Sequence, residues 1–286
     1  VFDRTVERQG LNDVKDQMMN PLKHLTFGGR IYGDNLVAGK TYTGIYTDTD
    51  FKGWSLKSRK PAQEHQIRLA LATLQCENPA DWETMLNKTI SKVQTDKKAK
   101  QKTRQWWNSY WKRSYVFIDS GKIGSDYWKV GRNYQLFRYM LGCNAYGSEP
   151  TKFNGGLFTF DPVHTDSTRV FTPDFRLWGG GTMTAQNQRL VYFPMLKSGD
   201  FDMMKPQFDF YERMLDNAKL RTKVYWNHEG ACFSEQIENF GLPNLAEYDW
   251  KPRHEGFPVG VDSNPWMEYT WDTALECTHD VRCALI

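Results

Sequence analysis

The densest group of side chains that could carry chemistry lies between residues 225 and 235. This segment reads Tyr225-Trp226-Asn227-His228-Glu229-Gly230-Ala231-Cys232-Phe233-Ser234-Glu235. A general acid must stay protonated near neutral pH, and apolar neighbours achieve this because desolvation disfavours the charged form. Glu235 lies between Phe233 and Ile237 and is therefore the preferred candidate acid, whereas Glu229 follows His228 and is expected to stay ionised. Either carboxylate also fits an ordinary salt bridge or a helix cap.

A second candidate group surrounds Asn187. Thr182 is expected to cap a helix in which Met183, Asn187, Leu190 and Pro194 share one face, so that a polar amide interrupts an apolar stripe. The pattern fits a core Asn bonded to backbone groups, and it fits equally an amide that faces a cavity and orients a water molecule or a sugar hydroxyl. Gln186 and Arg189 lie on neighbouring faces and support either interpretation.

The elements that would position these groups change character near residue 78. Residues 65–71 alternate apolar and polar side chains, residues 41–47 are rich in β-prone types, and frequent glycines mark turns, which predicts an antiparallel sandwich. From Asp81, a plausible helix cap, neither Gly nor Pro occurs before Gly121, which predicts helix. Strands followed by helices indicate separate β and α domains.

Two further helices are expected from apolar spacing. Tyr127, Val130, Tyr134, Phe137 and Leu141 would share a face of a helix that Gly142 ends, and Phe201, Met204, Phe208, Tyr211 and Leu215 repeat these steps. Pro206 then has to lie in the first turn. Long loops, residues 144–181 and 218–267, are expected between the helices, and loops of this length are usually functional or disordered. Their aromatic and glycine content favours function.

Composition excludes several classes. The 286 residues carry 37 basic and 34 acidic side chains, a net charge of +3 that is too balanced to predict nucleic-acid or membrane binding by bulk electrostatics. The basic cluster at residues 97–104 is interpreted as a solvated helix face, and no apolar run is long enough to span a membrane. Cys76, Cys143, Cys232, Cys277 and Cys283 form no CxxC pair, so no zinc or redox site is expected. The aromatic content, 15% with 11 Trp, slightly favours a sugar-binding cleft over a well-filled core.

Four segments together carry a resemblance to a known family: Trp106-Trp107-Asn108-Ser109-Tyr110-Trp111-Lys112-Arg113-Ser114, Asn154-Gly155-Gly156-Leu157-Phe158, Gln186-Asn187-Gln188-Arg189-Leu190-Val191-Tyr192-Phe193-Pro194-Met195-Leu196, and Tyr225 to Ala231. The chain resembles uncharacterised glycoside-hydrolase-like proteins of polysaccharide-degrading bacteria. Those proteins are in turn similar to the inverting α-L-fucosidases and α-L-galactosidases of glycoside hydrolase family 95. The resemblance covers almost the whole chain.

The resemblance implies an α+β multidomain fold. Residues 1–78 would be the end of an N-terminal β-sandwich, residues 79–105 a linker helix, and residues 106–286 the first part of an (α/α)6 toroid, or six-hairpin, catalytic domain. Tyr192-Phe193-Pro194 would stand for the family's Tyr-Trp-Pro motif. Asn187 would stand for the second residue of its Asn-x-Asn motif, and Ala185 would replace the first.

The resemblance also implies a chemistry. Ser234-Glu235 matches the family's general acid, without its usual intervening proline, and the base would lie beyond residue 286, so the chain is expected to be an incomplete and inactive part of the enzyme. The expected activity is inverting, exo-acting hydrolysis of plant or host glycans by acid/base catalysis, without metal or cofactor. A periplasmic or extracellular location and an oligo- or polysaccharide partner follow. The expected sugar-contacting residues are Trp178, Trp226, Asn227, His228, Arg189, Gln186 and Asn154.

Two other functions remain open from the sequence. A toroid-type polysaccharide lyase would use Tyr225 and His228 as acid and base, with Asn227 and Asn187 neutralising a uronate and Arg189 clamping it. A non-catalytic glycan-binding protein would use Trp226, Trp178 and Phe158 as platforms for sugar rings. Two carboxylates that face each other across a cavity would indicate the hydrolase. An Arg or Lys side chain placed to bind the uronate carboxylate would indicate the lyase.

Overall fold

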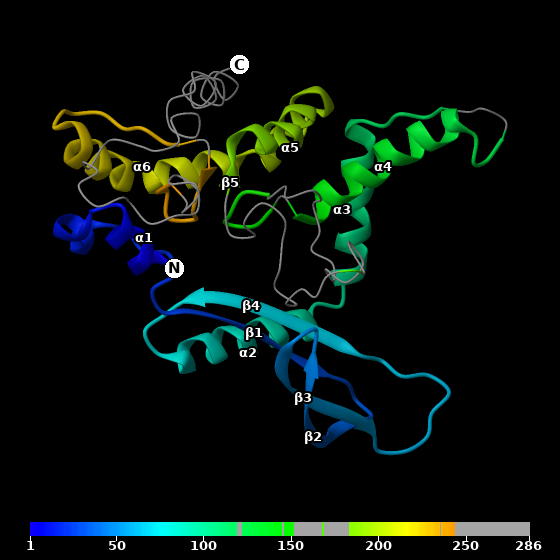
Figure 1. The fold of residues 1–286 in the computed structure, drawn as a ribbon. Helices are drawn as coiled ribbons and strands as arrows, with labels where there is room; N and C mark the ends of the chain where they lie inside the picture. The colour runs from blue at the N-terminus through cyan, green and yellow to red at the C-terminus, as the bar shows by residue number, and fades with distance from the viewer. Residues whose placement is uncertain (119–121, 145, 152–167, 169–182, 235, 244–286) are drawn as a thin grey trace. The chain divides into compact units, whose positions relative to one another are not determined.

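The computed structural model describes residues 1–118, 122–144, 146–151, 168, 183–234 and 236–243, and all structural statements concern these residues (Figure 1). They fall into two compact units. One comprises residues 21–105 and residue 168, and the other comprises residues 1–20 together with the remaining described residues from 106 onward. Antiparallel two-stranded sheets and several helices make this a mixed α and β chain, as expected at the level of fold class.

The first unit contains two antiparallel strand pairs. β1 (Leu25–Tyr32) pairs with β4 (Arg68–Gln75), and β2 (Leu36–Tyr46) pairs with β3 (Thr49–Ser58). Thr47 and Asp48 connect β2 to β3 with φ values of 44° and 64°, the conformation that a tight two-residue hairpin requires. The strand expected at residues 65–71 is therefore displaced, because it begins at Arg68 and extends to Gln75.

Helix α2 (Pro79–Thr95) covers one face of the β1–β4 pair. Its cap is Asn78, whose side chain accepts a hydrogen bond from the Ala80 N–H at 3.0 Å, and Pro79 occupies the first turn. Asp81, the expected cap, lies inside the first turn instead. The Trp82 indole donates to the Ala72 carbonyl at 3.1 Å and lies over Gly28, where a Cβ would meet the ring at 3.3 Å.

The helical stretch expected between residues 81 and 121 is broken after Thr95 and ends at Arg113. α2 ends at Thr95 and α3 (Ala99–Arg113) begins four residues later. The Asp96 carboxylate accepts a hydrogen bond from the Lys98 N–H at 2.9 Å and pairs with the Lys102 ammonium at 2.6 Å. An Asp side chain that bonds nearby backbone competes with helix continuation, so residues 79–105 form two helices rather than one linker helix.

The second unit is mainly helical. Its first elements are α1 (Phe2–Arg8) and the 3₁₀ helix η1 (Asn12–Gln17), so the chain begins with helix where strand was expected. The later elements are α4 (Asp126–Asn144), β5 (Met183–Thr184), α5 (Ala185–Ser198), the 3₁₀ turn η3 (Phe201–Met203), α6 (Lys205–Trp226) and β6 (Gln236–Ile237). Residues 218–226, expected in a loop, complete α6, and Pro206 lies in its first turn as predicted.

One hydrophobic cluster joins the middle of this unit. Its buried members come from α3, α4, α5 and the η3 turn: Tyr110, Leu141, Val191, Tyr192, Met195, Met203 and Met204. The half-buried rings of Trp106, Trp107 and Trp111 pack against it. Fully burying a side chain of this size contributes roughly 1.5–3 kcal/mol, so the aromatic face of α3 is first of all a packing surface.

Gly142 serves this packing rather than a helix end. It lies buried within α4, which continues to Asn144, and a Cβ there would meet the Trp107 ring at 3.1 Å and the Tyr110 ring at 3.2 Å. The expected apolar stripe is only partly correct, because Leu141 is buried while Tyr127 and Val130 are exposed.

The N-terminal segment is held against α6. Asn217, buried on α6, accepts a hydrogen bond from the Met19 N–H and donates to the carbonyls of Met19 and Phe240, each at 2.8 Å. The Phe2 and Phe240 rings meet edge to face, with centroids 5.1 Å apart. These contacts place residues 1–20 with the helices.

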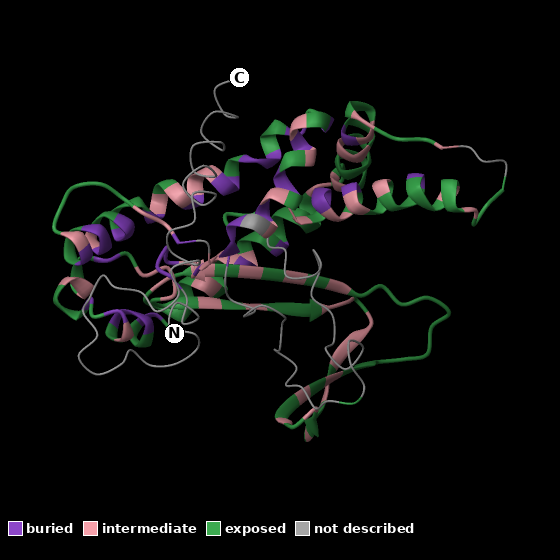
Figure 2. Ribbon diagram, turned by 45° about the horizontal axis from the view of Figure 1, so that its top comes forward, coloured by how far each residue is buried: buried purple, intermediate pink, exposed green. Residues whose placement is uncertain are grey.

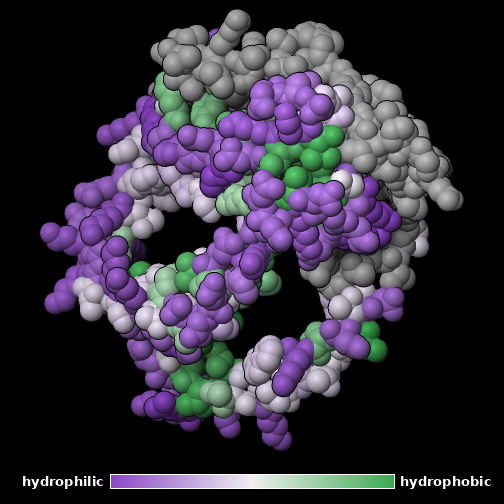
Figure 3. Space-filling view, turned by 90° about the vertical axis from the view of Figure 1, so that its left-hand side faces the viewer, coloured by the Kyte–Doolittle hydropathy of each residue, from purple (hydrophilic) through white to green (hydrophobic). Residues whose placement is uncertain are grey.

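Burial differs sharply between the two units. Figure 2 shows buried residues concentrated in helices, whereas no residue of β1 to β4 is fully buried. In the β1–β4 register, Ile31 lies opposite Leu69 and Gly29 opposite Leu71. The face of this strand pair that is turned away from α2 exposes four apolar side chains: Phe27, Ile31, Leu69 and Leu71. Hydrophobic groups also reach the surface among hydrophilic ones in Figure 3.

Within the described residues, no helix has the length and apolar character needed to cross a membrane.

Candidate functional site

A short antiparallel pairing joins the two sequence segments that carry the candidate site. Met183 pairs with Ile237 and Thr184 with Gln236, so β5 and β6 form a two-stranded ladder. β5 leads directly into α5, which carries Asn187 and Arg189, and β6 begins one residue after Glu235. Segments far apart in the sequence therefore meet at the start of α5.

Helix α5 begins at Ala185 and has Thr184 as its cap, so the cap expected at Thr182 is shifted by two residues. Asn187 and Arg189 are half-buried on this helix. The residue between them, Gln188, is buried and its amide donates to the Gln207 side chain of α6 at 3.2 Å. The buried amide is thus Gln188, whereas Asn187 lies at the edge of the buried face.

The end of α6 presents the other candidate residues. Trp226 is the last helical residue and is half-buried, and Asn227 caps the helix with φ 51° and ψ 35°. Asn tolerates this left-handed conformation better than most residues. His228 and Glu229 follow on the surface, and the His228 ring lies nearly parallel to the Trp226 ring with centroids 6.4 Å apart. The Glu229 side chain is 95% exposed, and its carboxylate lies 3.4 Å from the Lys223 ammonium.

The side chain of Tyr225 points into the core. Its hydroxyl donates to the Gln9 carbonyl at 2.9 Å, and the residue is buried. The buried Arg221 guanidinium lies 4.4 Å from the Tyr225 ring centre and 5.4 Å from the Trp226 ring centre. Such cation–π contacts stabilise the orientation of both rings, so the buried Arg221 side chain supports the Trp226 ring.

Several sequence candidates lie outside the described residues. These are Glu235, Trp178 and Asn154, together with Phe158, Thr182 and the side chain of Gln186. Both neighbours of Glu235 are described. Ser234 is buried and its hydroxyl donates to the Gln236 carbonyl at 2.8 Å, and Gln236 is half-buried in β6.

Glu149 is a carboxylate near α5 that the sequence did not single out. The Thr151 N–H donates to the Tyr192 hydroxyl of α5 at 2.7 Å, which ties this segment to the helix carrying Asn187. Arg213 of α6 bonds the Glu149 carboxylate at 2.9 Å and the Ser148 carbonyl at 3.0 Å. Partial burial raises the pKa of Glu149 despite the opposing charge of Arg213. No spacing in the sequence indicates this arrangement, because its partners come from separate elements.

The most deeply buried charges form a separate network. Arg138 of α4 bonds the Asp200 carboxylate through two nitrogens, at 2.9–3.1 Å, and donates to the carbonyls of Tyr110 and Ser114. The Ser198 hydroxyl also donates to Asp200 at 2.5 Å. Every charge-bearing group here is bonded within the protein, so the network fits a structural role. No sequence pattern indicates this network beyond the presence of the two charges.

An outer layer of the same network is partly exposed. Arg113 bridges Asp200 and Asp202 at 3.2 and 2.5 Å, and the Tyr146 hydroxyl donates to Asp202 at 2.7 Å. Burial alone would raise the pKa of Asp202, but the hydrogen bonds from Arg113 and Tyr146 outweigh it and lower that pKa. Burial and the bond to Asp202 raise the pKa of Tyr146 to about 12.

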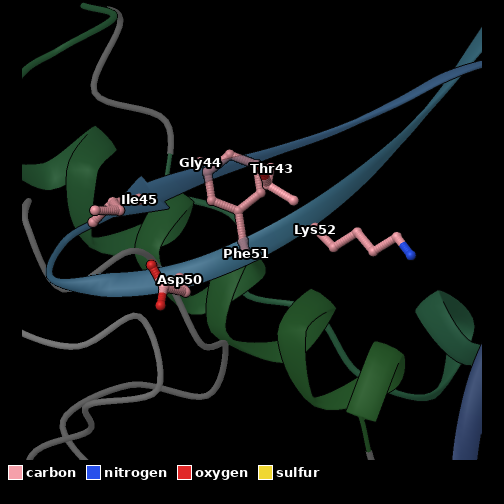
Figure 4. A pocket seen from close by; sticks show the side chains of 6 residues that line it. All are labelled: Thr43, Gly44, Ile45, Asp50, Phe51 and Lys52. Atoms are coloured by element: carbon pink, nitrogen blue, oxygen red, sulfur yellow. The ribbon is translucent and has the colours of Figure 1, made fainter.

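The hollow shown in Figure 4 lies elsewhere, against the β2–β3 hairpin. It is lined by Thr43, Gly44, Ile45, Asp50, Phe51 and Lys52. The Phe51 ring lies across Gly44, where a Cβ would meet it at 2.9 Å, so these residues serve cross-strand packing. None of the sequence candidates belongs to this hollow.

Among the described residues, no group of three or more His, Cys, Asp or Glu side chains is arranged to hold a metal ion.

Comparison with known proteins gives one match. Residues 1–116 match the N-terminal part of a family described as a domain of unknown function, DUF5703. The matched span runs from α1 through the end of α3. Neither the curated proteins nor the solved structures contain a match to this chain.

Proposed function

We propose that the protein is a glycoside hydrolase that cleaves plant or host glycans by inverting acid/base catalysis, with Glu235 as the general acid. The observation that carries the proposal is the β5–β6 ladder. It brings the neighbours of Glu235 to the start of α5, beside the helix that bears Asn187. The resemblance assigns the acid and the water-orienting amide to these two segments, and the ladder joins them although they are distant in sequence.

The environment on either side of Glu235 supports the assignment. Ser234, one residue before Glu235, and Ile237, two residues after it, are both buried. Burial of a carboxyl group disfavours its charged form and keeps a general acid protonated. The mechanism requires this proton for the leaving glycosidic oxygen, while a second carboxylate activates water on the opposite face of the sugar.

The finer fold assignment belongs to the same proposal. The exposed apolar face of the β1–β4 pair is what one layer of a β-sandwich presents to a second sheet. The consecutive helices α3 to α6 around a shared core fit the beginning of an (α/α)6 toroid. A periplasmic or extracellular site of action would follow from a polysaccharide substrate.

The contacts of Tyr225 argue against the lyase alternative. Its hydroxyl is buried and donates to a backbone carbonyl of the N-terminal segment, so it is not presented to a substrate. A glycan-binding role is compatible with the paired rings of Trp226 and His228. A turnover assay distinguishes this role from hydrolysis, because a binding protein does not cleave the glycan.

The deciding experiment is a turnover assay of the full-length protein, as wild type and as Glu235→Gln, against a panel of plant and host glycans. The amide preserves shape but supplies no proton, so turnover should fall by roughly 10²- to 10⁴-fold while sugar binding persists. Substrates with an activated leaving group should restore most of the rate. Glu229→Gln and Glu149→Gln are matched controls. Loss of turnover in Glu149→Gln but not in Glu235→Gln would transfer the role of acid to Glu149. Binding without turnover in the wild type would make the protein a glycan-binding module.

A further inference from the structure

Positive charge is concentrated on one short stretch of the first unit. Residues 88–104, which cover the second half of α2 and the first turns of α3, contain seven Lys or Arg and one acidic residue, Asp96. The whole chain carries a net charge of only +3, so this basic segment holds an excess that the rest of the protein offsets. Its cations are all exposed: Lys88, Lys92, Lys97, Lys98, Lys100, Lys102 and Arg104.

Most of these cations have no carboxylate partner among the described residues. In the part of the chain that the structure describes, Lys102 is the one member of the set that pairs with a carboxylate, that of Asp96. Four of the others form two i, i+4 pairs, Lys88 with Lys92 on α2 and Lys100 with Arg104 on α3. Like charges at this spacing repel, and cations in the first turn of α3 also oppose the helix dipole. The arrangement weakens the helices that bear it, and an anionic partner would relieve the repulsion.

We propose that the basic segment, residues 88–104, binds an acidic polysaccharide whose sugar rings carry carboxylates. The choice of a polysaccharide rests on the proposed function, and the charge pattern specifies that it is acidic. An i, i+4 step separates two cations by about 6 Å along a helix, comparable with one pyranose residue of a glycan. The exposed amides of Gln94 and Gln101 add donors and acceptors for hydroxyl groups.

The same composition disfavours a nucleic acid. No aromatic residue occurs in residues 88–104, so the segment lacks the rings on which unpaired bases stack. Six of the seven cations are Lys, a point charge, whereas planar bidentate recognition of phosphate is characteristic of Arg.

The test measures binding of the whole protein to polygalacturonate and to its fully methyl-esterified form, which has the same backbone without charge. The charged polymer should bind and the ester should not, and affinity should fall steeply between about 50 and about 200 mM salt. The triple variant K98Q/K100Q/R104Q should bind roughly ten-fold or more weakly and show a shallower salt dependence. The matched triple variant K40Q/K57Q/K60Q, which removes three exposed cations from β2, β3 and the segment after β3, should bind like the wild type.

Equal binding of the two polymers, or unchanged affinity in K98Q/K100Q/R104Q, would overturn the proposal. Tighter binding of single-stranded DNA than of polygalacturonate would overturn it in favour of a nucleic acid. The assay requires no turnover and the basic segment excludes Glu235. The Glu235→Gln turnover assay therefore tests the proposed hydrolase activity. The polymer-binding assay separately tests whether the basic segment binds an acidic polysaccharide.

Discussion

Arg138 and Asp200 form a buried ion pair that links α4 to the turn between α5 and α6, with Nη2 and Oδ1 2.9 Å apart. Both side chains are almost entirely removed from solvent. Taking two charges out of water is costly, and here the cost is offset by two-point contact and by bonds to backbone carbonyls and to Ser198. The pair therefore fixes how these elements meet around the Tyr110 ring, which lies 4.1 Å beneath the Arg138 guanidinium.

The first prediction concerns this pair. Asp200→Ala leaves the Arg138 cation buried without its carboxylate, and breaking a buried pair in this way typically costs about 3–5 kcal/mol. Asp216→Ala removes an exposed partner of Lys219 and should cost less than about 0.5 kcal/mol. Urea unfolding of the two variants measures the difference. Equal losses would show that solvent or another group replaces Asp200.

The second prediction is the pH dependence of Asp202. Its pKa is lowered in the folded protein, so the folded state favours the charged carboxylate. This stabilisation is present above the ordinary Asp pKa of 3.8 and is lost as the pH falls through the lower folded value. Asp202→Asn should therefore lose less stability than the wild type between pH 7 and about pH 3. Parallel pH profiles of unfolding for the two proteins would contradict the assignment.

The third prediction concerns Asn217. Asn217→Ala removes three hydrogen bonds and leaves the backbone groups of Met19 and Phe240 without these partners. Each buried group left unbonded costs about 1–3 kcal/mol, so the loss should exceed about 2 kcal/mol. The exposed Asn108→Ala on α3 is the control. Limited proteolysis should cut the variant near residue 20 before the wild type, and the same cleavage rate in both would refute the anchoring role.

The sequence predicted where most helices lie but not which side they bury. In α5, the spacing of Met183, Leu190 and Pro194 indicated one face, yet Leu190 is 59% exposed and the buried face contains Val191 and Met195. Apolar residues occur around most of this helix, so periodicity alone cannot choose between faces. The choice is made by the rings of α3 and the η3 turn that pack against it.

Long-range pairing accounts for the remaining differences. The antiparallel contact of Thr184 with Gln236 and the bond of Arg213 to Glu149 each join separate elements, and no local pattern encodes them. Local chemistry was more predictable where one residue type decides the outcome. Pro206 in the first turn of α6 is such a case. Asn78 was less predictable, because Asn and Asp near the start of α2 compete for the same capping position.

The last prediction concerns Asn227, which ends α6 between Trp226 and His228. Its backbone is left-handed, with φ 51°, and its N–H donates to the Lys223 carbonyl at 3.0 Å. Asn227→Gly should keep the turn, because Gly adopts this conformation without steric cost. Asn227→Ala should lose about 1 kcal/mol, because a Cβ crowds the following carbonyl in this region.

Thermal unfolding followed by Trp fluorescence distinguishes the two variants. The stacking of Trp226 on His228 depends on the same turn, so Asn227→Ala should also weaken any glycan binding that uses this pair of rings, whereas Asn227→Gly should not. A more stable Asn227→Ala than Asn227→Gly would mean that α6 continues beyond Trp226 in solution. The two rings would then no longer lie on the same side of the chain, because helical residues two positions apart point about 200° apart.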